Sequence, residues 1–374
     1  MTAGSAAPDE RRALSPDADA PNDRFRILAI DGGGVRGLIS ALVMEEIENR
    51  LGGRLGVEPA PRISDYFHLV AGTSAGGLAA LALTAPGGPG AAVLADFYRE
   101  DGPLIFDRDV WRKLSTLWGL RRPKYSAEPV RRAIENRVGN HRIADATRDL
   151  LVASYDMHES EPHFFKRWRA LESEERNVTL VDAALATSAA PTYFGSHGVG
   201  DRALVDGGVF ANDPAVAAIA EALGRASDPP AKLEPANILM LSIGTGEFEV
   251  GYEQRETGRW GALDWIRGSA GPPILNAILG GVTDGTDYWA HMLLNHETGE
   301  GVPPRAEIGR GPRYYRLQAK LDAPIALDEA SERNLTEVFP AAAEALVAER
   351  DAEIETIVER LLAASPVGQP ATPA

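Results

Sequence analysis

The sequence contains no cysteine among its 374 residues. A disulfide framework, a thiolate metal site and a cysteine nucleophile are therefore excluded, and the composition suits a reducing compartment. Basic residues are also fewer than acidic ones: the chain has 38 Lys and Arg residues against 54 Asp and Glu residues, which gives a net charge of -16. Since binding to nucleic acid requires clustered cations, we expect no nucleic-acid partner.

A recognisable membrane segment is missing as well. Residues 1–23 combine Ala, Pro and Asp with two arginines and have no apolar core, so we expect a disordered leader rather than a signal peptide or anchor. Residues 69–95 carry no charge over 27 positions, but they contain six glycines and two prolines, which fits a buried strand, turn and helix better than a membrane span. A second disordered tail is expected at residues 365–374. These features predict a cytoplasmic protein that meets membranes only peripherally.

Two glycine-rich turns stand out from this background. Each follows an apolar run typical of a strand and precedes a run typical of a helix; they read Asp-Gly-Gly-Gly-Val-Arg-Gly at residues 31–37 and Gly-Thr-Ser-Ala-Gly-Gly at residues 72–77. The second has the G-x-S-x-G spacing that places a serine hydroxyl on a tight strand-to-helix elbow. The first can supply the backbone N–H donors that such a serine needs.

Short apolar runs and helical patterns alternate along most of the chain. The strand–turn–helix unit occurs twice, which favours an α/β fold with a mostly parallel sheet covered by helices. Gly52 and Gly53 are expected to end the first helix, and Pro340 to interrupt the last. No linker requires a division, so residues 24–364 are expected to form one domain. The expected strands are 25–30, 66–71, 150–155, 203–206 and 237–243, and the expected helices are 38–51, 75–84, 181–190, 213–224 and 328–364.

Ester hydrolysis by a serine needs a hydroxyl, a base and oxyanion donors. Ser74 is the candidate nucleophile, although a serine before a helix is also a common capping residue. For the base, the order Ser74, Asp206 and then His291 or His296 would fit a Ser/acid/His triad. However, each of these two histidines lies in a helical or polar segment rather than in a loop at the end of a strand, which favours a surface histidine. Asp206 ends a short strand before two glycines, and such a position also suits an acidic turn residue. The seven histidines are His68, His141, His158, His163, His197, His291 and His296.

The three motifs taken together resemble the patatin-like family of lipid acyl hydrolases. In that family a D-G-G-G-x-[KR]-G loop, a G-T-S-[TA]-G-G elbow and a later D-G-G occur in this order, as they do here at residues 31–37, 72–77 and 206–208. Further stretches similar to the plant-type branch lie at residues 186–194, 209–214, 241–246 and 314–318, so that the resemblance spans residues 24–320. Asp213 replaces a second asparagine, a departure that we expect to alter a turn rather than the chemistry.

The resemblance implies a three-layer α/β sandwich and a Ser74/Asp206 dyad in which no histidine is catalytic. It also implies that the N–H groups of Gly33 and Gly34 hold the oxyanion, and that Arg36 either supports the loop or meets a phosphate. The expected reaction is hydrolysis of acyl esters in phospholipids or lysolipids, without a metal or cofactor. The expected supporting residues are Gly32, Arg36, Gly37, Gly72, Gly76, Gly207 and Gly208.

Two other functions remain open. Some bacterial relatives in this family are membrane-degrading effectors that a partner or ligand activates, and the same chemistry would serve such a role. Gly32, Gly34 and Gly37 also match the G-x-G-x-x-G fingerprint of dinucleotide-binding proteins, but the acidic residue expected at the end of the second strand is missing.

Access to a lipid substrate would require a surface that meets the membrane. Residues 111–132 combine aromatic side chains with seven cations and a single acid, a composition typical of contact with lipid headgroups, although a solvated surface would look similar. Residues 251–281, rich in Gly and Trp, are a candidate cover over the acyl pocket. The candidate membrane patch comprises Trp111, Arg112, Lys113, Trp118, Arg121, Arg122 and Lys124.

Overall fold

Five parallel strands form the centre of the sheet in this computed structural model, which describes residues 24–107, 123–225, 233–248, 252–268, 271–295, 307–364 and 366–367. Their order is β3-β2-β1-β7-β8, so the chain moves outward from β1 in both directions. Almost every residue of β1, β2 and β7 is buried, as expected for strands covered on both faces. The strands are β1 (Phe25–Ile30), β2 (Leu69–Thr73), β3 (Asp149–Asp156), β7 (Ile238–Ile243) and β8 (Tyr314–Leu317).

Three antiparallel strands complete the sheet beside β3. β4 (Glu161–Lys166) follows one side of β3, and β6 (Arg202–Asp206) follows the second half of the other side, beyond the end of β2. β5 (His197–Val199) pairs with β6 at the edge. The expectation of a mostly parallel sheet is therefore confirmed, with an antiparallel edge that the sequence did not indicate.

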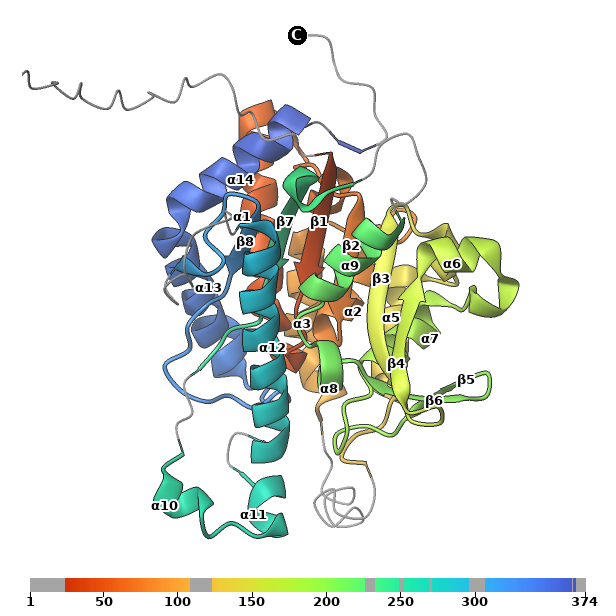
Figure 1. The fold of residues 1–374 in the computed structure, drawn as a ribbon, viewed down its shortest axis with the longest axis vertical. Coiled ribbons are helices and arrows are strands. Elements are labelled where there is room, and N and C mark those ends of the chain that lie inside the picture. The colour runs from red at the N-terminus through yellow and green to blue at the C-terminus, as the bar shows by residue number, and fades with distance from the viewer. Residues whose placement is uncertain are drawn as a thin grey trace, which may run out of the picture.

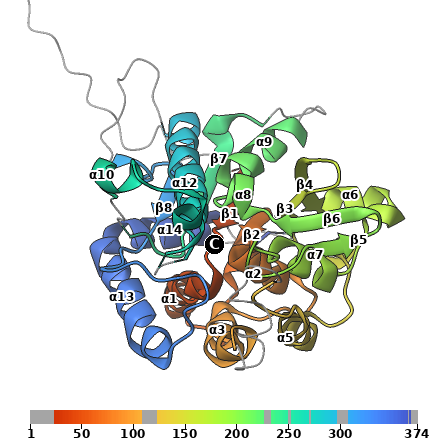
Figure 2. The same ribbon diagram turned by 90° about the horizontal axis from the view of Figure 1, so that it is seen from below.

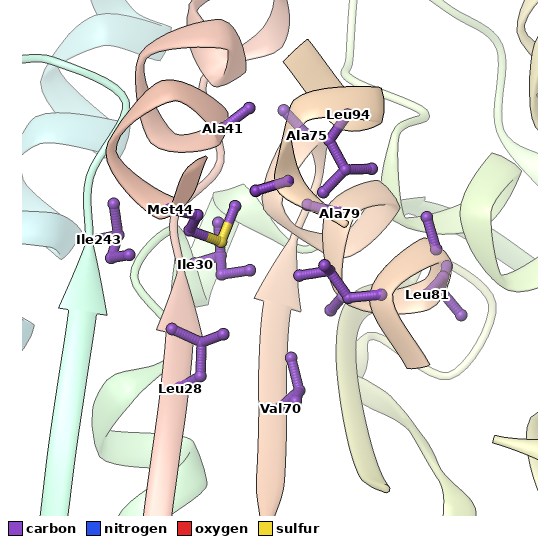
Figure 3. Close-up of a cluster of buried hydrophobic side chains, with 14 of the residues drawn as sticks. Leu28, Ile30, Ala41, Met44, Val70, Ala75, Ala79, Leu81, Leu94 and Ile243 are labelled. Atoms are coloured by element: carbon purple, nitrogen blue, oxygen red, sulfur yellow. The ribbon is translucent and has the colours of Figure 1, made fainter. Parts of the chain in front are cut away.

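Helices cover both faces of the sheet, and Figures 1 and 2 show the three layers. Side chains alternate along each strand, so that Leu28 and Ile30 face one helical layer while Ile27 and Ala29 face the other. Figure 3 shows part of the first of these cores, in which Leu28, Ile30 and Val70 of the sheet lie in one buried cluster with Met44 of α1 and Ala79 of α2. The helices of this larger layer are α1 (Gly37–Leu55), α2 (Ala75–Thr84), α3 (Ala91–Ile105), α5 (Glu128–Val138), α7 (Leu180–Thr187), α13 (Phe339–Glu349) and α14 (Asp351–Ala364).

The second layer is smaller and lies against β1, β2 and β7. It consists mainly of α9 (Ala215–Arg225) and α12 (Pro273–Leu294), whose buried alanines and leucines contact the sheet. The remaining short helices are α6 (Arg167–Glu172), α8 (Gly208–Ala211), α10 (Gln254–Thr257) and α11 (Ala262–Ile266). Single 3-10 or π turns are η1 (Gly34–Arg36), η2 (Ile63–Tyr66), η3 (Ile143–Asp145), η4 (Glu174–Arg176), η5 (Pro235–Asn237) and η7 (Asn334–Val338). In the described part of the chain, no helix is both long and apolar enough to cross a membrane.

Several expected boundaries were wrong. α1 continues through Gly52 and ends at Gly56, which adopts the left-handed conformation, because glycine inside a helix costs only about 1 kcal/mol. The second strand begins at Leu69, since the residues before it form η2. Pro340 does not interrupt a helix, because the π turn η7 lies directly before α13 and the helical backbone continues through the proline; the break falls at Arg350.

The two expected disordered ends lie mostly outside the described residues. Nothing in residues 1–23 belongs to the described part, and of the tail only residues 366–367 do. There, the Val367 N–H donates to the Asp65 carbonyl at 2.8 Å.

Candidate active site

Ser74 occupies the turn between β2 and α2. Its φ of 54° and ψ of -122° are unusual for a residue with a side chain, and such strain is typical of a serine held on a strand-to-helix elbow. Glycine is required on both sides: a Cβ at Gly72 would lie 2.2 Å from the Gly76 carbonyl oxygen, and one at Gly76 would lie 2.1 Å from the Ile30 carbonyl oxygen. The turn therefore places the partly exposed Ser74 at the N-terminus of α2.

Asp206 lies beside Ser74 because two strands end at neighbouring residues of β3. β2 runs parallel to β3 as far as the pair Thr73 and Ala153, and β6 runs antiparallel to it as far as the pair Asp206 and Ser154. Since β4 holds the opposite side of β3, the ends of β2 and β6 meet on one side. The sheet thus brings Ser74 and the Asp206 carboxylate together from distant parts of the sequence.

The Asp206 carboxylate is buried and hydrogen-bonded. Burial raises its pKa from 3.8 to about 6, although hydrogen bonds from the Ser74 hydroxyl and the Gly208 N–H lower the pKa in part. The Gly208 N–H donates to Oδ1 at 2.8 Å. A carboxylate with a pKa near 6 is a stronger base than an ordinary aspartate and is still ionised at neutral pH.

The first glycine turn lies next to the elbow. The Gly76 N–H donates to the Asp31 carbonyl at 3.1 Å, which joins the two turns, and the Val35 N–H donates to the Leu327 carbonyl at 2.9 Å. Between these anchors, the N–H groups of Gly33 and Gly34 have no hydrogen-bond acceptor among the described residues. Gly34 has a φ of +58°, and a Cβ there would lie 2.2 Å from the Leu327 carbonyl oxygen, so this position also requires glycine. Two free donors therefore remain beside Ser74, as oxyanion binding requires.

Arg36 supports this loop from inside the protein. Its Nε donates to the Gly33 carbonyl at 3.4 Å and its Nη1 to the Gly246 carbonyl at 3.3 Å, while the guanidinium lies 5.2 Å from the Phe248 ring centroid. Burial lowers the pKa of Arg36 to about 10. Of the two roles considered for Arg36, the contacts favour support of the loop, because the side chain is too buried to meet a phosphate.

A buried ion cluster lies beneath the loop. Arg316 on β8 donates to Asp31 Oδ1 and to Ser242 Oγ, each at 2.8 Å, and lies 3.5 Å from Asp213 Oδ2. Burial, with the nearby charge of Asp31, raises the pKa of Asp213 to about 7, although Arg316 opposes this. Asp213 does shape a turn, since its Oδ1 accepts the Ala215 N–H at 2.8 Å, but its effect extends to this cluster.

Thr187 and Leu327, which the sequence analysis did not select, also contribute to the site. Thr187 accepts the Ser74 N–H at 2.9 Å and donates to the Ala153 carbonyl at 2.6 Å, so it holds the elbow against β3. Thr187 belongs to a motif quoted above, residues 186–194, which could have identified it. No sequence signal points to Leu327, whose role depends on the fold alone.

Two pockets meet at Ser74. The larger contains about 610 Å³ of empty space and lies among α2, α3 and α5, where its lining is mainly apolar and includes Leu78, Phe97, Ile105 and Phe106. The smaller contains about 280 Å³ and is lined by Gly33, Asp206, Asn212, Leu275 and Leu279, among others. Ser74, Ala190 and Leu327 line both, so the candidate nucleophile stands where the two pockets join.

Histidine does not line either pocket within the described residues. His291 is buried at the end of α12, where its Nδ1 accepts the Gly309 N–H at 3.2 Å, and His296 lies outside the described residues. His68 and His197 are likewise engaged elsewhere, with the Arg26 N–H and the Asp182 carboxylate. In the same part of the chain, no group of three or more acidic or histidine side chains is placed to hold a metal ion.

Replacing His291 with glutamine should lower the free energy of unfolding by about 1–2 kcal/mol, because buried donors next to it lose an acceptor. We expect kcat/KM for ester hydrolysis to stay within about twofold of the wild-type value. Thermal unfolding and a soluble-ester assay would check this. A loss of activity as deep as that of Ser74→Ala, without loss of stability, would instead support a catalytic histidine.

The candidate membrane patch lies largely outside the described residues. Of its seven residues, only Lys124 is described, and it forms an ion pair with Asp328 and lies 5.0 Å from the Tyr193 ring centroid. Its charge is therefore engaged within the protein.

Comparisons with known proteins identify the family of this chain. The sequence model of the family described as "Patatin-like phospholipase" matches residues 28–219. "Patatin-like protein 1" of Oryza sativa subsp. indica is 31% identical over 308 residues, covering 76% of this chain and 74% of the relative, and "Patatin-like protein 2" of Arabidopsis thaliana is 33% identical over 289 residues, covering 70% of each. "Patatin-07" of Solanum tuberosum is 33% identical over 263 residues, covering 64% and 66%.

Among solved structures, VipD from Legionella pneumophila aligns with 87% of this chain and 67% of its own, at 9% identity and a TM-score of 0.36. The residues that the family model matches include the glycine loop, the elbow and the strand that carries Asp206. This chain therefore belongs to the patatin-like phospholipase family, in its plant-type branch.

Proposed function

We propose that this protein is a phospholipase A or lysophospholipase that cleaves fatty acyl esters with a Ser74/Asp206 dyad. Membership of the family indicates a lipid acyl hydrolase. The observation that carries the finer proposal is the convergence of the Ser74 hydroxyl, the Asp206 carboxylate and two free N–H groups at the junction of two pockets. Nucleophile, base and oxyanion donors are the groups that ester hydrolysis by a serine requires.

In the first half of the reaction, Ser74 Oγ attacks the acyl carbonyl while its proton moves to Asp206. The N–H groups of Gly33 and Gly34 stabilise the negative charge that develops on the carbonyl oxygen. As the tetrahedral intermediate collapses, Asp206 returns the proton to the departing alcohol, and an acyl-serine remains. Water then attacks this ester with Asp206 again as the base, and a fatty acid is released with Ser74 restored.

The pockets suggest how the substrate lies. The larger, apolar pocket suits the fatty acyl chain, because burial of each methylene contributes about 0.8 kcal/mol. The smaller pocket is lined by Asp206 and Asn212 as well as leucines and suits the departing alcohol. We also place the enzyme in the cytoplasm, peripheral to the membrane, so that it reaches the lipid layer from the aqueous side.

Gly102 offers a test of the acyl side, because it lines the larger pocket and a Cβ there meets only Val35 at an ordinary 3.4 Å. Gly102→Leu should fill the pocket and lower kcat/KM for palmitoyl esters about tenfold relative to butyryl esters. Gly102→Ala is the matched control and should change this ratio little. Equal losses on both esters would contradict the assignment of the pocket.

The raised pKa of Asp206 predicts the pH dependence of hydrolysis. Because the base must be ionised, kcat/KM should increase with pH around a midpoint near 6 and level off above about pH 7. A pH–rate profile on a soluble ester, repeated with His291→Gln, measures this midpoint. If the midpoint moved in the histidine variant, the base would not be Asp206.

The substrate class can be tested with a panel of phospholipids and lysolipids whose products are identified by mass spectrometry. Wild-type protein should release free fatty acid, together with the matching lysolipid from a phospholipid or the glycerophosphodiester from a lysolipid, whereas Ser74→Ala should release neither. Parallel reactions with added cell extract reveal an activating partner or ligand. Failure of all reactions to release fatty acid would overturn the proposal.

A further inference from the structure

Large apolar side chains are exposed on α11 and on the first turns of α12. α11 buries none of its residues, and Leu263, Trp265 and Ile266 are exposed in it. On α12, Ile274 and Ile278 are exposed by 45% and 40%. We call the set Leu263, Trp265, Ile266, Ile274 and Ile278 the apolar rim. Soluble proteins rarely leave such a group uncovered unless it contacts a partner.

The apolar rim adjoins the candidate active site. Leu275 and Leu279, which alternate with Ile274 and Ile278 along α12, line the smaller pocket beside Ser74 and Asp206. The Leu279 side chain also lies against Gly208, where a Cβ would approach to 2.9 Å. One flank of the α12 N-terminus therefore forms the pocket wall while the other flank is exposed. Figure 1 shows α11 beside the lower end of α12, beyond the end of the sheet.

The charge of this region differs from that of the whole protein. Residues 252–283 contain three arginines and three acidic residues, so their net charge is zero in a chain of charge -16, and residues 271–283 contain no charged residue. The Trp260 ring lies edge-on to Tyr252 at 4.7 Å and to Trp265 at 5.0 Å, forming an aromatic cluster near the arginines. Aromatic and aliphatic side chains beside arginines are typical of proteins that lie at a membrane interface.

We infer that the apolar rim is the surface on which this protein docks to a lipid layer, with its aromatic and aliphatic side chains inserted at the headgroup level. The inference rests on the proposed function for its choice of a lipid partner, because docking here would place the mouth of the smaller pocket next to the substrate. Since the region is neutral, attachment depends on apolar contact rather than on attraction to anionic lipids. The rim would serve the role that the sequence analysis assigned to the cationic patch, most of which lies outside the described residues.

Vesicle co-sedimentation of the full chain tests this surface. The test variant is Trp265→Ser/Ile274→Ser/Ile278→Ser, and the matched control is Trp289→Ser/Leu293→Ser, whose residues are exposed by 57% and 46% farther along the same helix. All proteins carry Ser74→Ala, so that binding is measured without hydrolysis. We expect the test variant to bind phosphatidylcholine vesicles at least about tenfold more weakly, and the control to bind normally.

Two further measurements distinguish apolar docking from charge-driven binding and from dimerisation. Adding phosphatidylglycerol or lowering the salt should change binding little; strong enhancement would overturn the inference in favour of a cationic surface. Analytical ultracentrifugation should show the same mass for wild type and test variant, because a dimer that the substitutions dissociate would mean that a second copy covers the rim. Unchanged vesicle binding by the test variant would also overturn the inference.

With Ser74 restored, the test variant should lose at least about ten times more activity on vesicle lipid than on a short-chain soluble ester. An equal loss on both would mean damage to the site rather than to docking. If wild-type protein hydrolyses no lipid but binding still depends on the rim, the proposed function fails while the docking surface stands.

Discussion

Replacing Ser74 with alanine should lower kcat/KM for lipid and soluble esters by about 10⁴-fold or more, with only a modest loss of thermal stability. In the proposed mechanism the hydroxyl is the attacking group, so its removal would abolish the covalent route and leave only binding and oxyanion stabilisation. The contact with Thr187 is kept, because Ser74 makes it through its N–H, so the only bond lost is that from the hydroxyl to Asp206, which should cost about 1–2 kcal/mol at neutral pH. Steady-state kinetics and thermal unfolding measure the two effects.

Ser188→Ala provides the matched control. Ser188 lines the same apolar pocket, but its hydroxyl donates to the Ala184 carbonyl at 2.7 Å in α7. We expect this variant to keep most of its activity. If Ser74→Ala hydrolysed esters at a rate close to wild type while Ser188→Ala did not, the nucleophile would have to be reassigned.

Replacing Asp206 with asparagine should abolish most activity and at the same time stabilise the folded protein at neutral and alkaline pH. Asparagine cannot take the Ser74 proton, so we expect kcat/KM to fall by about 10³-fold or more. The amide oxygen can still accept the Gly208 N–H, and the burial of a charge is avoided. The gain in stability therefore has the same origin as the raised pKa.

The pH dependence of this gain follows from the direction of the pKa shift. The folded-state pKa of Asp206 is raised from 3.8 to about 6, so its stabilising contribution is full below about pH 4 and is lost as the pH rises through about 6. The change in pKa corresponds to about 3 kcal/mol. Asp206→Asn should thus match wild type near pH 4 and exceed it by up to that amount at pH 8.

Denaturant unfolding at both pH values measures this difference. The exposed Asp201 in the turn between β5 and β6 supplies the control, and Asp201→Asn should differ from wild type by the same small amount at each pH. Equal stability of Asp206→Asn and wild type at pH 8 would contradict a buried carboxylate of raised pKa.

The parallel core of the fold was predictable because its signals are local. Each apolar run followed by a glycine turn and a helical pattern specifies one strand–turn–helix unit, and several such units can pack only as helices on a parallel sheet. β4 escaped prediction because it lies at an edge, is half exposed and contains Pro162, which weakens any strand pattern. β8 was recognised only as a motif, since four residues are too few for a period to show.

In the candidate site, too, the features encoded by a few consecutive residues were predictable and those formed by distant residues were not. The elbow of Ser74 and the loop of Gly33 and Gly34 could be located from glycine spacing, because close backbone approach leaves glycine as the only fitting residue. The contact between Leu327 and Val35 could not be predicted, because the two residues are far apart in the sequence. The exposed flank of α12 could not be predicted either, because only tertiary packing places the opposite flank of this helix in the wall of a pocket.

By itself, the sequence determined that a serine stands on a strained turn beside a glycine loop, since both features depend on a few consecutive residues. Only the tertiary structure decided which carboxylate lies beside that serine. β2 and β6 end side by side on β3, and this non-local pairing brings Asp206 to Ser74. The same packing buries the carboxylate, and because the charged form is disfavoured away from water, burial raises its pKa into the range of a useful base.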